Sequence, residues 1–171
     1  MARLRRLSLM ALFIAMAVVL HWLEGFLPRP LPFMRWGFAN IFTLCALYLF
    51  GGAAGLTVAV CRVVLAGLLT GSIFAPTFGF ALAGGLAAGL AMWAMPQKRF
   101  SAVGVSVAGA AAHMLAQLAV AALLIRHQAL LNFVPAFTLV AVASGVLNGY
   151  AALMVLDVAS QRGFSPINQK A

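Results

Sequence analysis

The stretch LTVAVCRVVLAGLLTG (residues 56–71) holds a single charge, Arg62, in the middle of an apolar run. The whole chain has 171 residues, of which 65% are hydrophobic and 8% charged, and its mean hydropathy is +1.08. A water-soluble domain of this size needs a more charged surface. Long apolar runs with few charges are instead typical of segments that cross a lipid bilayer.

The apolar runs indicate helices rather than strands. Backbone polar groups in hydrocarbon must be satisfied internally, so only helices and closed barrels span a membrane. Barrel strands alternate polar and apolar residues, and residues 56–71 show no such alternation. The sequence therefore predicts an all-α, polytopic membrane protein. Residues 1–171 are expected to form one integral membrane domain with a short polar tail at about 159–171.

Six apolar runs predict six transmembrane helices in one bundle. Between the first two runs, GFLPRPLPFMRWG (residues 25–37) contains three prolines and cannot continue as a regular helix. The predicted helices lie at about residues 7–27, 38–50, 53–69, 80–95, 103–125 and 131–158.

The basic residues predict the orientation of the bundle. The net charge of +9 would suit a nucleic-acid partner, but these residues lie mostly at the ends of apolar runs, which favours a topological role and no nucleic acid. Seven of them fall on the side of both termini and three on the other, which places the termini in the cytoplasm and the chain in the cell (inner) membrane. The seven are Arg3, Arg5, Arg6, Lys98, Arg99, Arg162 and Lys170; the three are Arg29, Arg35 and Arg126.

Arg62 is the residue that most needs a partner. It lies roughly 14 Å from either end of its predicted helix at 1.5 Å per residue, where a lipid-facing arginine is costly. Only Glu24 and Asp157 are acidic, and both are expected near the ends of their helices rather than at the depth of Arg62. Three interpretations stay open: a structural arginine bonded to carbonyls and water, a cation at the floor of a ligand cavity, or a lipid-facing side chain that snorkels.

Other polar residues share helix faces with one another. His113 and Gln117 are four residues apart, as are Ser144 and Asn148, so each pair lies on one face. Such pairs either join helices by hydrogen bonds or line a ligand cavity. His21 and Glu24 share a face near the outer end of the first helix, where Glu24 pairs with Arg29 or Arg35 or contacts a ligand.

The sequence offers no catalytic or metal-binding pattern. There is one aspartate, so no Asp-rich motif for magnesium and diphosphate exists, and there is no Gly-rich phosphate loop or nucleotide-binding motif. Cys45 and Cys61 form no CxxC pair and are expected to be small buried apolar residues. We therefore expect no enzyme activity, no cofactor and no metal.

Several blocks of the chain resemble a known family, which is named heptaprenyl diphosphate synthase component I or the Gx transporter family. The matching motifs cover nearly the whole chain. Alanine and methionine replace the family's serine and asparagine at Ala81 and Met114. The blocks are Leu23-Glu24 before the Pro-rich loop, GFAN (37–40), CRVVLAGLLTGSIF (61–74), ALAGG (81–85), GAAAHMLAQ (109–117) and NFVPAFTLVAVASGVLNGY (132–150).

The family is also distantly similar to the substrate-binding S components of energy-coupling factor transporters. That resemblance implies six helices, a ligand pocket toward the outer face, and docking on a transmembrane coupling subunit driven by two ATPases. It also implies that an Ala-xxx-Ala face on the first helix makes this contact, and Ala11 and Ala15 have that spacing.

These observations lead to a prediction of small-solute uptake by an S-component-like subunit in the bilayer. The arginines favour an anionic or carbonyl-rich ligand, although the solute is unknown. An alternative is a non-catalytic membrane component of heptaprenyl or polyprenyl diphosphate synthesis, with a soluble prenyl synthase as partner; a third is a structural scaffold. The expected binding residues are Glu24, Arg35 and Asn40 at the outer mouth, Arg62, His113 and Gln117 deeper, and Asn148.

Overall fold

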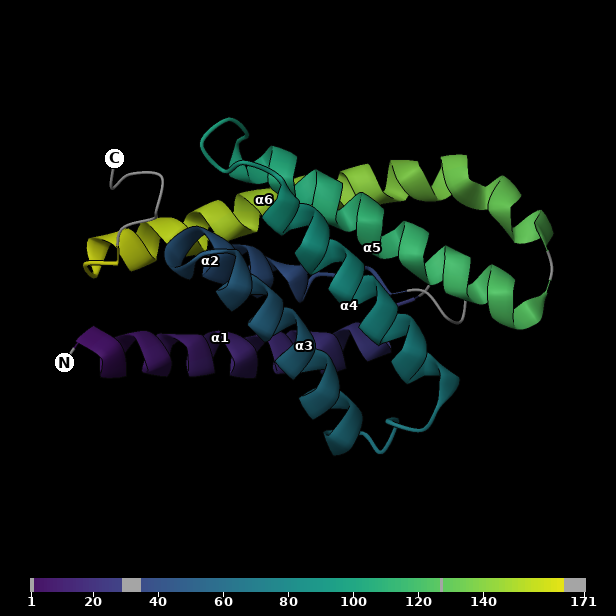
Figure 1. Cartoon of the computed structure of the whole chain (residues 1–171), viewed down its shortest axis with the longest axis horizontal. Helices are drawn as coiled ribbons and strands as arrows, with labels where there is room; N and C mark the ends of the chain where they lie inside the picture. The colour runs from purple at the N-terminus through teal and green to yellow at the C-terminus, as the bar shows by residue number, and fades with distance from the viewer. Residues whose placement is uncertain (1, 29–34, 127, 165–171) are drawn as a thin grey trace.

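The computed structural model describes residues 2–28, 35–126 and 128–164, and these ranges are helical without strands (Figure 1). Arg29 and the last part of the polar tail lie outside them. Short 3-10 turns follow α1 and precede α6, at Glu24–Phe26 (η1) and Gln128–Phe133 (η2). The α-helices are α1 (Ala2–Leu23), α2 (Asn40–Phe50), α3 (Gly52–Leu69), α4 (Pro76–Ala94), α5 (Ala102–Ile125) and α6 (Val134–Gln161).

Five of these helices are long and apolar enough to cross a membrane, which confirms the expectation of an all-helical, multi-pass membrane protein. The exception is α2, which has 11 residues and is about 16 Å long, half of a typical hydrocarbon core. Its end at residue 50 is as predicted, and its start lies two residues after the predicted one of about 38. Gly37 has φ +81°, which is incompatible with an α-helix, and the chain makes a turn before Asn40 begins α2.

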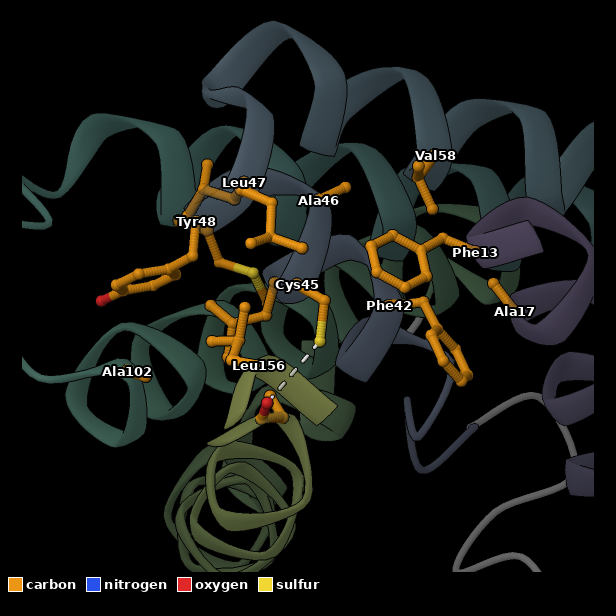
Figure 2. Close-up of a cluster of buried hydrophobic side chains, with 14 of the residues drawn as sticks. Phe13, Ala17, Phe42, Cys45, Ala46, Leu47, Tyr48, Val58, Ala102 and Leu156 are labelled. Atoms are coloured by element: carbon orange, nitrogen blue, oxygen red, sulfur yellow. Dashed lines mark hydrogen bonds between the residues drawn. The ribbon is translucent and has the colours of Figure 1, made fainter. Parts of the chain in front are cut away.

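The short helix α2 occupies the centre of the bundle. Each of the other five α-helices packs against it, and nine of its residues are buried. Figure 2 shows part of this core, in which Leu47 and Tyr48 of α2 lie among side chains from α1, α3, α5 and α6. The Cys45 thiol points to the Ala152 carbonyl of α6 at 3.8 Å and makes no disulfide. The interior position of Cys45 agrees with the expectation from sequence.

Helices that follow one another in the chain pack side by side from α3 to α6, and the most extensive packing is between α5 and α6. Glycines make this packing possible. A Cβ atom on Gly145 would lie 2.6 Å from the Cα of Val107, and one on Gly149 would lie 2.7 Å from the Cα of Val103. Close backbone contact through small residues is a common way for membrane helices to associate.

The start of α1 and the end of α6 lie at the same end of the bundle (Figure 1). The Arg5 guanidinium donates a hydrogen bond to the Arg162 carbonyl, and Arg6 donates to the Phe50 carbonyl at the end of α2 (3.3 Å). The Tyr48 hydroxyl donates to the Phe100 carbonyl (3.3 Å), so the α4–α5 connection lies there too. The basic residues near both termini therefore share one end; its cytoplasmic orientation stays a prediction.

The packing of α6 on α5 leads to a first prediction. Gly145→Ala should lower the free energy of unfolding by about 1–3 kcal/mol, because the new methyl group meets backbone atoms that cannot rotate away. The control is Gly79→Ala in α4, where an added Cβ has no atom within 4 Å. Thermal unfolding in detergent should show a lower midpoint for the first variant alone, and equal midpoints would contradict the described contact.

Candidate functional site

Polar side chains gather around the N-terminal end of α2, in the interior of the bundle. The residues predicted from sequence to bind a ligand meet here, and we refer to them as the polar cluster: Glu24, Arg35, Asn40, Arg62, His113, Gln117 and Asn148. All but Arg35 are buried. The turn from Arg35 to Ala39 connects them, because the side chains of Glu24, Gln117 and Asn148 each bond to its backbone.

Arg62 projects from the middle of α3 toward α2 and is 1% exposed. Its Nη2 donates a hydrogen bond to Asn40 Oδ1 at 2.5 Å. Asn40 is the first residue of α2, so the arginine contacts the start of the short helix. The lipid-facing interpretation of Arg62 is therefore wrong, and the arginine faces the interior.

The carboxyl group of Glu24 is buried in the same cluster as Arg62. The 3-10 turn η1 follows α1 and buries this carboxylate, whose Oε1 accepts a hydrogen bond from the Ala39 N–H at 3.1 Å. Arg62 and Arg35 both act electrostatically on it. A carboxylate at a helix N-terminus also interacts favourably with the helix dipole. Glu24 thus lies closer to Arg62 than the sequence indicated, because the chain turns inward after Leu23.

His113 and Gln117 form the part of the cluster that α5 contributes. Gln117 Nε2 and His113 Nε2 are 3.0 Å apart, and Gln117 Oε1 accepts a hydrogen bond from the Arg35 N–H at 3.0 Å. The imidazole fits because α4 carries Gly84, where a Cβ would lie 2.8 Å from His113 Nδ1. His113 Nδ1 lies near the Gly84 carbonyl but without hydrogen-bond geometry. The shared face predicted for His113 and Gln117 is confirmed.

The two residues of the second polar pair, Ser144 and Asn148 of α6, make different contacts. Asn148 Nδ2 donates a hydrogen bond to the Gly37 carbonyl at 3.1 Å and so belongs to the cluster. Ser144 donates to the Ala141 carbonyl of its own helix at 3.2 Å. The spacing alone could not distinguish them, since only Asn148 lies beside the turn that precedes α2.

Several buried polar atoms of the cluster lack partners in the part of the chain that the structure describes. They are Asn40 Nδ2, Arg62 Nε, His113 Nδ1 and Asn148 Oδ1, together with the hydroxyl of Thr43 one turn along α2. A buried polar group without a hydrogen bond costs about 1–3 kcal/mol. The cluster therefore has spare donors and an acceptor in an apolar interior, where a ligand or water could bond.

A pocket of about 290 Å³ opens beside the cluster, at the end of the bundle opposite the start of α1. Arg35 lines it and also belongs to the cluster, whereas Arg62 does not line it. Arg35 Nη1 donates to the His21 carbonyl at 3.0 Å. Of the other lining residues, the sequence analysis had singled out His21 alone, although TGS after α3 is an unusually polar stretch. The lining is His21, Trp22, Gly25, Phe26, Arg35, Thr70, Ser72 and Thr77.

The remaining candidates lie elsewhere. Ala11 and Ala15 are exposed on the outer face of α1, while Phe13 and Ala17 face the core. The described residues contain no group of three or more histidine, cysteine or acidic side chains that could hold a metal ion. Ala81 and Met114, where the chain departs from the family pattern, are buried apolar residues.

Comparison with known proteins agrees with the motifs in the sequence. The family model of heptaprenyl diphosphate synthase component I matches residues 13–155, a range that includes the whole polar cluster. No curated protein and no solved structure matches the chain. Because the matched range covers most of its length, the chain belongs to the heptaprenyl diphosphate synthase component I family.

Proposed function

We propose that the chain binds a small anionic or carbonyl-rich solute at the polar cluster and serves as the substrate-binding subunit of an uptake system of the energy-coupling factor type. The observation that carries the proposal is Arg62. Its guanidinium is buried in the bundle interior, and its Nε has no partner among the described residues. Ionisable groups within membranes are costly and usually functional.

The charges of the cluster favour an anion. The cluster contains two arginines, Arg35 and Arg62, and one acidic residue, Glu24, so basic side chains outnumber acidic ones there. The N-terminal end of α2 adds a partial positive charge at the same place. Membrane transporters use the N-termini of half-length helices in this way to hold anionic substrate groups.

The pocket provides a route to the cluster. A solute in the pocket would contact Arg35 first, because its guanidinium lines the wall. The backbone of Arg35 is bonded to Gln117, so movement of the turn that precedes α2 would expose the deeper groups. Uptake also needs energy, and the exposed Ala11 and Ala15 would let a helix of a coupling subunit with two ATPases approach α1 closely.

Solute retention tests this proposal. Arg35→Gln and Asn148→Ala should each reduce the amount of co-purifying small molecule at least about tenfold, because each removes a hydrogen-bonding group from the route or the cluster. Arg126→Gln, an exposed arginine at the end of α5, is the control with the same change of charge as Arg35→Gln. Mass spectrometry of protein purified in mild detergent measures the ratio. Equal amounts in all variants would rule out this site.

The pairing of Glu24 with Arg62 gives a separate prediction about stability. Arg62→Met should destabilise the chain by about 3–5 kcal/mol, because it removes one of the two arginines that act on the buried Glu24 and leaves Asn40 Oδ1 without its donor. In a Glu24→Gln background the same change should cost about 1–3 kcal/mol less. With exposed Asp157→Asn in place of Glu24→Gln, the effects should add within about 0.5 kcal/mol. Denaturation in detergent measures the cycle, and additivity in both backgrounds would show that the two charges are not coupled.

A second candidate function follows from the family name. The chain would then be a non-catalytic membrane component that accompanies a soluble synthase of prenyl diphosphates, and the cluster would be structural. Its family membership is the observation that favours this function.

Purification of the tagged chain from its native membrane should separate the two candidates. Uptake predicts that a transmembrane coupling subunit and two ATPases co-purify, and that Ala11→Leu with Ala15→Leu lowers their recovery. The control Leu12→Ala with Met16→Ala changes exposed residues of the same helix by reducing their size. Recovery of a prenyl synthase instead would favour the second function and contradict the first.

A further inference from the structure

We propose that a groove between α1 and α6 binds an acidic glycerophospholipid from the surrounding leaflet. This site is independent of the polar cluster and lies at the opposite end of the bundle, where α1 starts and α6 ends. The groove has a volume of about 440 Å³. Arg5 and Arg162 line one end of it, and the walls include Leu9 and Leu12 of α1 and Val155 and Val158 of α6.

The groove is basic at one end and apolar along the rest of its length. It therefore matches the polar head group and the apolar tail of a lipid. On α1 the chain runs from Arg5 at the helix start to Leu12, seven residues or roughly 10 Å deeper. On α6, which ends near Arg162, Val155 lies seven residues before that arginine and so at a comparable depth. Both walls therefore change from guanidinium to aliphatic in the same direction, which suits a phosphate head group with its acyl chain alongside.

The Arg5 side chain is held against the end of α6. The Arg5 guanidinium donates a hydrogen bond to the Arg162 carbonyl and lies 4.4 Å from the centre of the Phe164 ring. Both side chains remain exposed. Because Arg5 and Arg162 both line the groove, both guanidinium groups are available there for charge-assisted hydrogen bonds to a phosphate.

No carboxylate of the described chain neutralises this end of the groove. The chain has two acidic residues. Glu24 is buried in the polar cluster, and Asp157 accepts a hydrogen bond from Gln161 (3.1 Å) and does not line the groove. The positive charge at the groove is therefore complementary to an anionic head group, and each basic residue near a membrane surface adds to attraction of acidic lipids.

The groove can be entered sideways from the hydrocarbon. Within the described residues α1 and α6 make no close backbone approach, since both pack on α2 instead. Leu12 and Val158 are 53% and 51% exposed, so an acyl chain could lie against them. A small soluble anion would leave this apolar length uncovered, and for that reason we assign the groove to a phospholipid.

Native mass spectrometry of the full-length chain, titrated with phosphatidylglycerol or phosphatidylcholine in mild detergent, tests the assignment. Phosphatidylglycerol should bind more tightly than phosphatidylcholine. Arg5→Gln with Arg162→Gln should weaken phosphatidylglycerol binding about 30-fold, from two lost charge contacts. The control, Arg3→Gln with Arg99→Gln, removes the same charge from exposed arginines that do not line the groove and should bind as the unmodified chain does.

Val158→Trp examines the apolar length separately, because it fills the groove from an exposed position without changing the charge. It should weaken phosphatidylglycerol binding while solute retention at the polar cluster stays unchanged. Equal binding of both lipids, equal losses in the two arginine double variants, or no effect of Val158→Trp would overturn the proposal. Displacement of phosphatidylglycerol by a lower concentration of farnesyl diphosphate would also overturn it, in favour of a prenyl diphosphate site.

Discussion

The hydrogen bond between Arg62 and Asn40, with the Glu24 carboxylate beside it, is the interaction on which the interior of this protein depends. A guanidinium at this depth is tolerated only where the bundle supplies an acceptor and a counter-charge. Asn40 can supply the acceptor because α2 begins in the interior, and Glu24 can supply the charge because η1 turns inward. The short helix α2 thus supplies the hydrogen-bond acceptor for Arg62, and the turn η1 brings an acidic side chain into the same cluster.

The other polar residues follow from that arrangement. The turn before α2 has free backbone groups that a regular helix would have paired internally, and these groups must be satisfied where water is scarce. Gln117, Asn148 and Glu24 bond to them from three different helices. A break in the helical path therefore gathers polar side chains into one place, and such a place is where a membrane protein can recognise a polar solute. The same network would also serve a chain whose role is to hold a partner enzyme at the membrane.

The helical class and most helix positions could be predicted from hydropathy alone, because backbone pairing leaves few options in lipid. The face shared by His113 and Gln117 followed from helical spacing, and the depth of Arg62 from its distance to the ends of its run. The short length of α2 also followed to within two residues, because the predicted run of about 38–50 begins just after the Pro-rich segment and ends where the helix ends. The separation of Ser144 from Asn148, and the hydroxyl-rich pocket, depend on contacts between distant segments that no local pattern encodes.

The half-length of α2 makes the two leaflets unequal. In the half nearest the chain ends, α2 fills the centre with closely packed side chains, and that core resists compression. In the other half, the residues that the structure describes place the turn from Arg35 to Ala39 and the polar cluster among the longer helices. Under the proposed solute binding, shape changes that admit or release a guest would therefore occur mainly in that half, and lateral pressure in the surrounding leaflet would govern their rate more than pressure in the opposite leaflet.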